Sequence, residues 1–234
     1  MRSALLEAAA VGPFFQLEVH DHGLPPGWQP ARELFENDLN ELAARNAERL
    51  GTDEIRVSTS ILHLSFAARI WSPVLGCASL AGAVPDLASL VVTTEPSIRL
   101  GLTDLVARRP DTNGDSRAEA QAGLAELAAA VTGAPLAELA SALPVRLARG
   151  LLRGNSASAM AGALGELVRV RPDLGESAAA LGAALLRTPG LAGAGRLTGS
   201  GLAFRRHSCC LYYRVPGGGL CGDCCFDHSP STRR

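Results

Sequence analysis

The sequence contains no lysine, few aromatic residues and no long run of uncharged residues. Its 22 basic residues are all arginines and are nearly balanced by 23 acidic residues, which gives a net charge of −1. Such a total produces no general attraction to nucleic acid or to a membrane surface. The longest uncharged stretch, residues 70–85, is too short to span a bilayer and contains Pro73. We therefore expect no nucleic-acid partner and no transmembrane segment.

The N-terminal residues lack the apolar run and cleavage site of a secretory signal peptide, so we expect a cytoplasmic protein. The chain also lacks a phosphate-binding glycine loop between a strand and a helix. Its run of three glycines, residues 217–219, lies instead within a group of cysteines. We expect no bound nucleotide or flavin, and no covalent nucleophile is recognisable.

The N-terminal part of the chain predicts a short strand and then a helix. Residues 14–19, FFQLEV, have the composition of a strand, and a loop rich in proline and glycine follows them. Phe35, Leu39 and Leu42 then fall on one face of a helix that Gly51 ends.

The next segment predicts two buried helices with a corner between them. Residues 53–70 are apolar nearly all round, which is typical of a helix in the middle of a fold. Ser72 and Pro73 suit the first positions of a second helix, so Trp71 is expected at the corner. Cys77 lies alone in an apolar run and is expected to be an ordinary buried residue.

The rest of the body predicts one or two strands and then helices. Residues 90–102 predict one or two strands broken at Pro96, and residues 110–115 predict a turn. Residues 136–171 predict two helices broken near Gly154. Two pairs have the spacing of a capping box that starts a helix, namely Ser116 with Glu119 and Asp173 with Glu176.

The fold class expected from these patterns is α+β and predominantly α-helical. Residues 1–189 would form a mainly helical body with short strands. Residues 190–201 contain five glycines and would form a flexible connection. Residues 202–234 would form a cysteine-rich C-terminal segment with a hairpin.

This C-terminal segment holds five of the six cysteines, Cys209, Cys210, Cys221, Cys224 and Cys225. In a reducing compartment such a group indicates a metal or redox site more often than disulfides. Four thiolates can hold one zinc ion or an iron–sulfur cluster. Zinc usually takes paired ligands with two or more residues between them, whereas adjacent cysteines in an extended segment point to opposite sides. The adjacent pair therefore favours a larger object with two iron atoms.

The residues between and around the cysteines fit a redox site. Pro216 and the three following glycines permit a tight reversal, and their N–H groups are candidate donors to cluster sulfur. Residues 201–234 carry five arginines and two aspartates, a net charge of +3. Arg205, Arg206 and Arg214 are expected to form a positive rim that attracts an anionic electron acceptor.

The arrangement Cys-Cys-x10-Cys-x2-Cys in RRHSCCLYYRVPGGGLCGDC resembles the C-terminal signature of the FhuF-like ferric-siderophore reductases. AARIWSPVLG, residues 67–76, is similar to a stretch in actinobacterial members of that group. The resemblance implies a [2Fe–2S] cluster with Cys209, Cys210, Cys221 and Cys224 as ligands. It also implies reduction of Fe(III) in ferric siderophores in the cytoplasm. Cys225 departs from the family pattern and is interpreted as a spare thiol.

The implied reductase would dock a ferric siderophore at the positive rim and would receive its electron from a separate donor such as a ferredoxin or a reductase. Tyr212 and Tyr213 are candidates either for contacting the siderophore and shielding the cluster or for packing the segment onto the body. Arg205, Arg206 and Arg214 are candidates for binding the substrate or tuning the cluster, and for Arg206 and Arg214 pairing with a carboxylate of the body is an equal alternative.

The histidines have lesser roles in this interpretation. His207 and His228 flank the cysteines and are candidates for tuning. His20 and His22, with Asp21 between them, are expected to lie in a solvated loop.

Two other classes of function stay open from the residues alone. One is an iron–sulfur regulator or sensor whose cluster state changes its affinity for a partner. The other is an interaction module stabilised by zinc.

Overall fold

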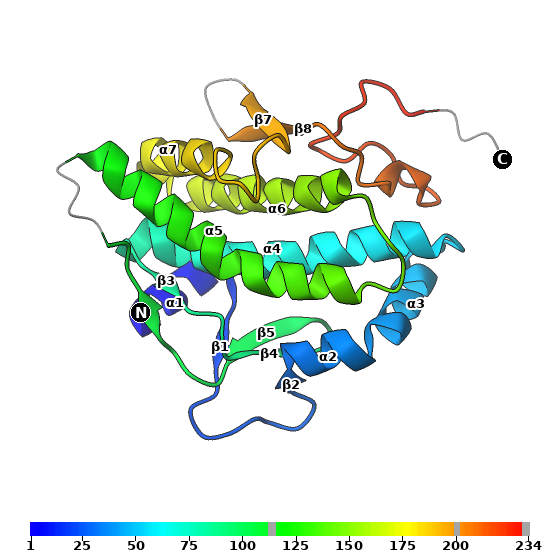
Figure 1. The fold of residues 1–234 in the computed structure, drawn as a ribbon, viewed down its shortest axis with the longest axis horizontal. Helices are drawn as coiled ribbons and strands as arrows, with labels where there is room; N and C mark the ends of the chain where they lie inside the picture. Colours follow the sequence, from blue (N-terminus) through cyan, green and yellow to red (C-terminus); the bar gives the residue numbers. More distant parts are fainter. Residues whose placement is uncertain (112–115, 199–201, 231–234) are drawn as a thin grey trace.

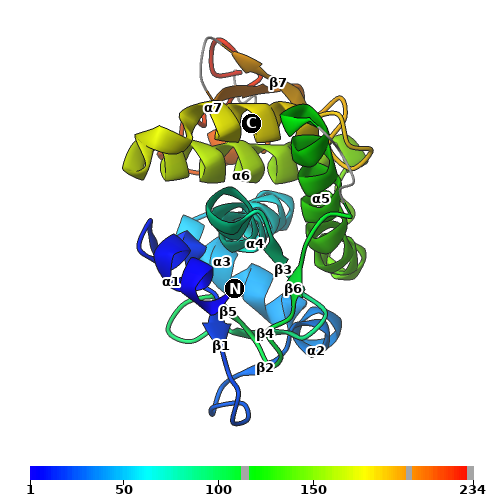
Figure 2. The same cartoon turned by 90° about the vertical axis from the view of Figure 1, so that its left-hand side faces the viewer.

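The computed structural model describes residues 1–111, 116–198 and 202–230 and shows a predominantly helical α+β protein. Figure 1 shows α4 through the middle of the molecule, with α6 and α7 on one side and the strands of the main sheet on the other. Seen end-on in Figure 2, α1, α3 and α5 surround α4. The fold class expected from the sequence is confirmed.

The elements follow one another along the chain with these bounds. The α-helices are α1 (Arg2–Ala9), α2 (Ala31–Asn37), α3 (Leu39–Leu50), α4 (Ile55–Ala81), α5 (Arg117–Ala142), α6 (Arg149–Val170) and α7 (Gly175–Leu185). The strands are β1 (Glu18–Val19), β2 (Gln29–Pro30), β3 (Val84–Pro85), β4 (Leu90–Thr93), β5 (Arg99–Leu102), β6 (Ala107–Arg108), β7 (Gly195–Thr198) and β8 (Ala203–Arg206). Short 3₁₀ turns are η1 (Pro13–Phe15), η2 (Pro172–Leu174) and η3 (Tyr212–Arg214).

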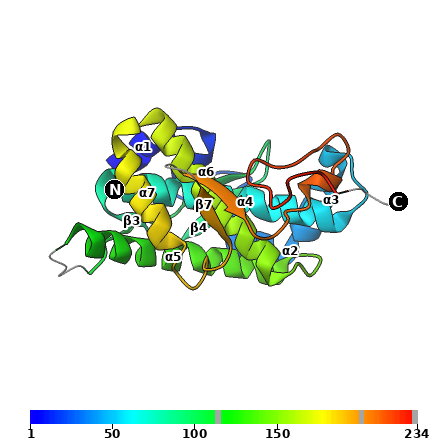
Figure 3. The ribbon, with the colours of Figure 1, turned by 90° about the horizontal axis from the view of Figure 1, so that it is seen from above.

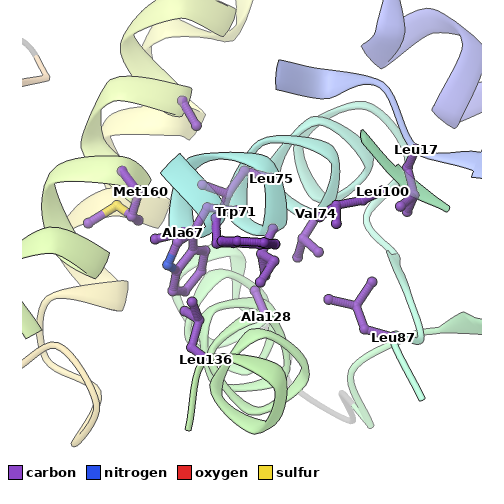
Figure 4. Close-up of a cluster of buried hydrophobic side chains, with 14 of the residues drawn as sticks. Leu17, Ala67, Trp71, Val74, Leu75, Leu87, Leu100, Ala128, Leu136 and Met160 are labelled. Atoms are coloured by element: carbon purple, nitrogen blue, oxygen red, sulfur yellow. The ribbon is translucent and has the colours of Figure 1, made fainter. Parts of the chain in front are cut away.

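Helix α4 is the centre of the core and continues through Pro73 without a corner. Trp71 is buried, and its indole N–H donates to the Ser156 hydroxyl of α6 at 2.8 Å. Figure 4 shows Trp71 close to Met160 of α6 and Leu136 of α5. The expected helix break at Ser72 and Pro73 was therefore wrong. Packing on both sides outweighs the cost of a proline inside a helix, which is about 3 kcal/mol.

The main sheet has the order β1-β5-β4-β2. Strands β4 and β5 pair antiparallel on either side of the turn that contains Pro96, as expected. The predicted strand over 14–19 is reduced to β1, because Pro13–Phe15 forms a 3₁₀ turn that buries Phe15. A separate two-stranded sheet joins β3 to β6.

The helix boundaries follow the local signals only in part. Gly51 ends α3 with a left-handed φ of 63°, and the capping box of Ser116 and Glu119 starts α5. The sequence predicted one helix before Gly51, whereas the structure has two, α2 and α3, which meet at Asp38. The second capping box is absent, because α7 begins without a side-chain cap and Asp173 pairs with Arg171 instead.

Helix α6 runs unbroken through Gly154, so the expected break there was also wrong. An added Cβ at Gly154 would lie 2.8 Å from the Arg206 guanidinium and would also meet the Ser208 hydroxyl. The glycine therefore serves the close approach of the C-terminal segment to the helix and not a helix end.

The connection over 190–201 contains β7, which pairs antiparallel with β8. Residues 199–201, and most of the turn predicted over 110–115, lie outside the described residues. The division into body, connection and C-terminal segment stays a prediction.

By length and composition, α4 and residues 118–142 of α5 are apolar enough to cross a membrane. The apolar part of α4 is 72% buried within the fold, which is typical of the core helix of a soluble protein.

We predict that Gly154→Ala lowers the melting temperature, because overpacking costs about 1–3 kcal/mol and a chain of this size loses about 2–4 °C per kcal/mol. Gly165→Ala is the control on the same helix, since nothing lies within 4 Å of its added Cβ. Differential scanning calorimetry of the two variants tests this. Equal melting temperatures would show that the close approach at Gly154 is unimportant.

Candidate metal centre

The cysteines follow β8 directly and lie over the beginnings of α4 and α6. In Figure 3 the β7–β8 hairpin crosses α6, and the orange and red C-terminal segment continues toward the start of α4. The Ser60 hydroxyl of α4 donates to the Cys210 carbonyl at 2.7 Å, and the Ser208 hydroxyl donates to the Gly150 carbonyl of α6 at 2.7 Å. These bonds attach both ends of the first cysteine pair to the helical body.

Two of the thiols are at the spacing that one metal requires. The Cys210 and Cys221 sulfurs are 3.5 Å apart. Two sulfurs on one tetrahedral metal, each about 2.3 Å from it, lie about 3.8 Å apart. Within the described part of the chain, no three His, Cys, Asp or Glu side chains are grouped as ligands of a single ion. A close pair fits a two-iron cluster, in which each iron takes two thiolates, better than it fits one zinc ion.

The remaining thiols belong to the same group. Electrostatic interaction with Cys210, Cys225 and Cys224 contributes to raising the pKa of Cys209, after burial as the main cause. Electrostatic interaction with Cys224 likewise contributes to raising the pKa of Cys221. The structure therefore brings together all five cysteines of the C-terminal segment. Cys77 lies apart in α4, where burial raises the pKa of its thiol to about 12, so it is an inert core residue as expected.

Backbone N–H groups point at several of the sulfurs. The Leu211 N–H donates to Cys209 Sγ at 3.2 Å, and the Phe226 N–H donates to Cys224 Sγ at 3.4 Å. Leu211 reaches this position with a left-handed φ of 70°. Such bonds raise the reduction potential of an iron–sulfur cluster. The glycines expected to donate instead make the reversal, since the Gly218 N–H bonds the Val215 carbonyl at 2.8 Å.

The pKa values of the two thiols in the close pair are shifted in opposite directions. A hydrogen bond from Cys221 lowers the pKa of Cys210 to about 6, with smaller help from Arg206. The same bond raises the pKa of Cys221. Burial raises the pKa of Cys209 to about 11. Of these three thiols, Cys210 loses its proton most readily, and metal binding must displace protons from Cys209 and Cys221.

Arg206 is buried beneath the cysteines, at 1% exposure. Its guanidinium donates to Asn155 Oδ1 at 2.8 Å, to the Leu151 carbonyl at 3.4 Å and to the Ser208 carbonyl. Its Nη1 has no hydrogen-bond partner among the described residues. A buried cation with spare N–H groups needs negative charge close by, and the Cys210 thiol and the Asp223 carboxyl are both within electrostatic reach of Arg206.

A chain of buried polar groups links Arg206 to α4 and α6. Asn155 donates to the Ser60 carbonyl at 2.9 Å, and Ser60 in turn bonds Cys210. The Ser158 hydroxyl donates to the Asp223 carboxylate, which lies between Cys221 and Cys224. We did not predict these residues from the sequence. The signal was present as short runs of polar residues inside two otherwise apolar helices, at 58–60 and 155–158.

His63 of α4 was also missed by the sequence reasoning. It is 2% exposed, and its Nδ1 lacks a hydrogen bond among the described residues. Burial, and then the charge of Arg206, lower the pKa of His63 to about 4. His63 is therefore neutral at physiological pH.

The expected positive rim is not free for an anion. Arg205 pairs with Asp227 at 2.6 Å, and Arg214 pairs with Glu54 at 2.6 Å. Arg206 is buried, as described above. Two of the three charges are thus neutralised at the surface, and the third lies inside the protein.

The tyrosines and histidines of the segment have different surroundings. Tyr212 is exposed, whereas Tyr213 packs edge-on against Phe226 at 5.8 Å between ring centroids. His207 Nδ1 lies 3.1 Å from the Gly193 carbonyl, and His228 is exposed. The roles assigned to these residues stay predictions.

The loop histidines and the spare cysteine complete the predicted residues. His20 packs against Trp28 and its Nε2 is buried, so only part of the His20-Asp21-His22 loop is solvated. Asp21 pairs with Arg2 at 2.8 Å. Burial raises the pKa of Cys225, and a hydrogen bond with Cys209 counters part of that effect.

Residues 206–226 match the family model of the FhuF 2Fe-2S C-terminal domain. The match begins at Arg206 and includes every cysteine of the segment. It supports an FhuF-like chain with a C-terminal region that binds a [2Fe–2S] cluster. None of the curated proteins compared with the chain matches it.

We predict that Arg206→Gln destabilises the protein and prevents stable cluster retention, because each buried partner left unpaired costs on the order of 2 kcal/mol. The neighbouring, half-exposed Arg205 provides the control, and Arg205→Gln is expected to leave the melting temperature nearly unchanged, because a surface ion pair contributes little. Melting temperature and iron content measure both effects. Similar losses in the two variants would contradict the buried role of Arg206.

We predict that His63 lowers the free energy of unfolding of the protein at acidic pH. Its pKa in the folded chain is about 4, below the value of 6.5 in an unfolded chain. Between pH 6.5 and pH 4, His63 therefore gains a proton only in the unfolded chain. The contribution of neutral His63 to stability is full above pH 6.5 and is lost as the pH falls toward 4. At pH 5 the loss is about 2 kcal/mol.

The comparison is His63→Leu with His22→Leu, which changes an exposed histidine, as its control. The drop in melting temperature between pH 7.5 and pH 5 should shrink by about 4–8 °C in His63→Leu. An unchanged drop would show that His63 takes up its proton in the folded protein.

Proposed function

We propose, from the FhuF-like [2Fe–2S] domain at the C-terminal end of this chain, that the protein reduces Fe(III) in ferric siderophores to Fe(II) in the cytoplasm and so releases the iron. The coarser conclusion, an iron–sulfur oxidoreductase of the kind that acts on siderophore iron, is what the family match supports. The single structural observation that carries the proposal is the close Cys210–Cys221 pair within a group of five thiols.

The proposed ligands are Cys209, Cys210, Cys221 and Cys224. The N–H bonds to Cys209 and Cys224 support this set, because they orient these two sulfurs beside the close pair. Cys225 is proposed to be a spare thiol.

The bound cluster would supply one electron to the chelated ferric ion. Hard oxygen donors hold Fe(III) far more tightly than Fe(II), so this single electron loosens the chelate without breaking any of its covalent bonds. The transfer requires no bond between the protein and the substrate iron. A separate electron donor is part of the proposal.

The residues around the thiols would prepare the site for the extra electron. The buried Arg206 offsets negative charge on the thiolates, and the N–H donors of Leu211 and Phe226 add to this effect. The rings of Tyr213 and Phe226 pack edge to face, and Phe226 is bonded to Cys224 through its N–H. Together these features favour the reduced state.

We predict that Cys210→Ser abolishes a stable cluster, whereas Cys225→Ser retains it. Cys210 provides the thiolate with the lowered pKa and belongs to the close pair. Anaerobic purification with visible absorption spectra, iron and sulfide analysis tests the two variants side by side. Equal loss in both would show that the ligand assignment is wrong, and zinc without iron or sulfide in the unmodified protein would exclude the reductase.

The activity is tested without oxygen by reducing the cluster chemically and adding a ferric siderophore. The expected result is loss of the EPR signal of the reduced [2Fe–2S] cluster, together with Fe(II) captured by a ferrous chelator. Persistence of the signal with siderophores of several classes would contradict the proposal and favour a sensor.

A further inference from the structure

The fifth thiol of the segment, Cys225, lies against one of the proposed ligands, although the ligand pattern does not require it. Its side chain forms a hydrogen bond with Cys209 and interacts electrostatically with Cys224. It is partly buried and forms no disulfide. Cys225 is therefore a free thiol inside the group that holds the cluster, and its position calls for a role.

Two sulfurs compete for one place in the ligand set. The Cys210 and Cys221 sulfurs, 3.5 Å apart, are placed to serve one iron of a two-iron cluster. Cys209 is then a ligand of the second iron, which needs one more thiolate. Both Cys224 and Cys225 interact electrostatically with Cys209, and the interaction with Cys225 is the stronger of the two. Either sulfur is thus within reach of the fourth place.

The backbone around these two cysteines is held by the end of β8. The Arg206 N–H donates to the Asp223 carbonyl at 3.0 Å, and the Arg205 guanidinium donates to the Cys225 carbonyl at 3.4 Å. The chain bends at Cys225, so adjacent side chains need not point to opposite sides as they do in an extended strand. Exchange of one sulfur for the other therefore needs rotation of two side chains and no movement of the backbone.

The surroundings stabilise a thiolate at either position. Arg205 interacts electrostatically with both Cys224 and Cys225. The Phe226 N–H donates to Cys224 Sγ at 3.4 Å, and the Cys225 sulfur accepts a bond from its own N–H. Positive charge and N–H donors both favour the ionised sulfur that binds iron.

The Cys210 position has no comparable substitute. Cys210 is 2% exposed, and Ser60 fixes its carbonyl at 2.7 Å. The sixth cysteine of the sequence, Cys77, is buried in α4, apart from the group. Loss of the Cys210 sulfur therefore leaves its iron without a replacement thiolate.

We propose that Cys225 is a second ligand for the iron that Cys209 binds, and that it takes the place of Cys224 when the sulfur of Cys224 is not bound. In the exchange the Cys225 thiol releases a proton to solvent as its sulfur bonds to iron. The bond from Cys224 to iron breaks, and the Cys224 sulfur takes up a proton. No electron moves, so no oxidant or reductant is needed. This inference rests on the ligand set proposed above and gives the chain two such sets, which share Cys209, Cys210 and Cys221.

The first test compares Cys224→Ala, Cys225→Ala and the double variant after anaerobic reconstitution with iron and sulfide. Alanine is chosen because it removes every ligand atom. We expect each single variant to keep more than about half of the iron and sulfide of the unmodified protein, and the double variant less than about a tenth. A loss in Cys224→Ala as complete as the loss in Cys210→Ala overturns the proposal.

The second test asks directly whether Cys225 binds iron. Iodoacetamide is added anaerobically to the cluster-loaded proteins, and mass spectrometry locates the alkylated cysteines. Cys225 is a free thiol in the unmodified protein and should be alkylated, whereas in Cys224→Ala its alkylation should slow by at least about tenfold. Equal alkylation of Cys225 in the two proteins overturns the proposal.

A further variant guards against misfolding of Cys224→Ala. Cys224→Ser keeps the size of the side chain, and its folding is checked by circular dichroism. Protection of Cys225 from iodoacetamide in the loaded Cys224→Ser protein supports the exchange, and alkylation of Cys225 there contradicts it.

These readouts use no siderophore, so they are independent of the reductase activity. A protein that retains its cluster in Cys224→Ala but does not reduce ferric siderophores confirms the second ligand and contradicts the proposed function. A protein that reduces ferric siderophores but loses its cluster in Cys224→Ala supports the function and contradicts the second ligand.

Discussion

The buried guanidinium of Arg206 is the interaction on which the site and the body both depend. A charge at 1% exposure is unfavourable unless it is hydrogen-bonded and balanced by opposite charge. Asn155 and the carbonyls of Leu151 and Ser208 provide the hydrogen bonds, and they come from α6 and from the segment itself. The Cys210 thiol and the Asp223 carboxyl, which both interact electrostatically with Arg206, provide the balancing charge. The cysteine segment is therefore part of the core and not an appended tail.

This dependence explains the polar residues inside the two central helices. Helices α4 and α6 pack closely, and at the end near the cysteines their contact is made by Ser60 and Asn155 instead of aliphatic side chains. The same Ser60 bonds the Cys210 carbonyl. The residues by which the two helices hold the segment are therefore the residues that bond the helices to each other. Gly154 completes the arrangement by leaving room for Arg206. The small and polar residues cost some apolar burial, and in return they define one position for the cysteines.

The sequence predicted the features that short-range chemistry determines. The capping box at Ser116 and the C-terminal stop at Gly51 depend on residues close together in the chain, and the structure contains both. The cysteine spacing is equally local, and the family match supports the cluster-binding region that it indicates. Pro73 and Gly154 were interpreted as helix breaks because the rules for these residues are local, whereas packing between distant helices decided the outcome. The partners of the three arginines beside the cysteines could not be predicted for a similar reason, since a sequence gives the sign of a charge but not its burial or its partner.

The arginines near the thiols are already engaged, because Arg205 and Arg214 are in ion pairs and Arg206 is buried. An anionic substrate would have to displace one of these contacts to bind there. Because outer-sphere transfer needs no bond from the protein to iron, the residues that hold the cluster need not be the residues that contact the substrate. The arginines of the segment therefore serve first to position the thiols against the body, through Glu54 for Arg214 and through Asn155 for Arg206.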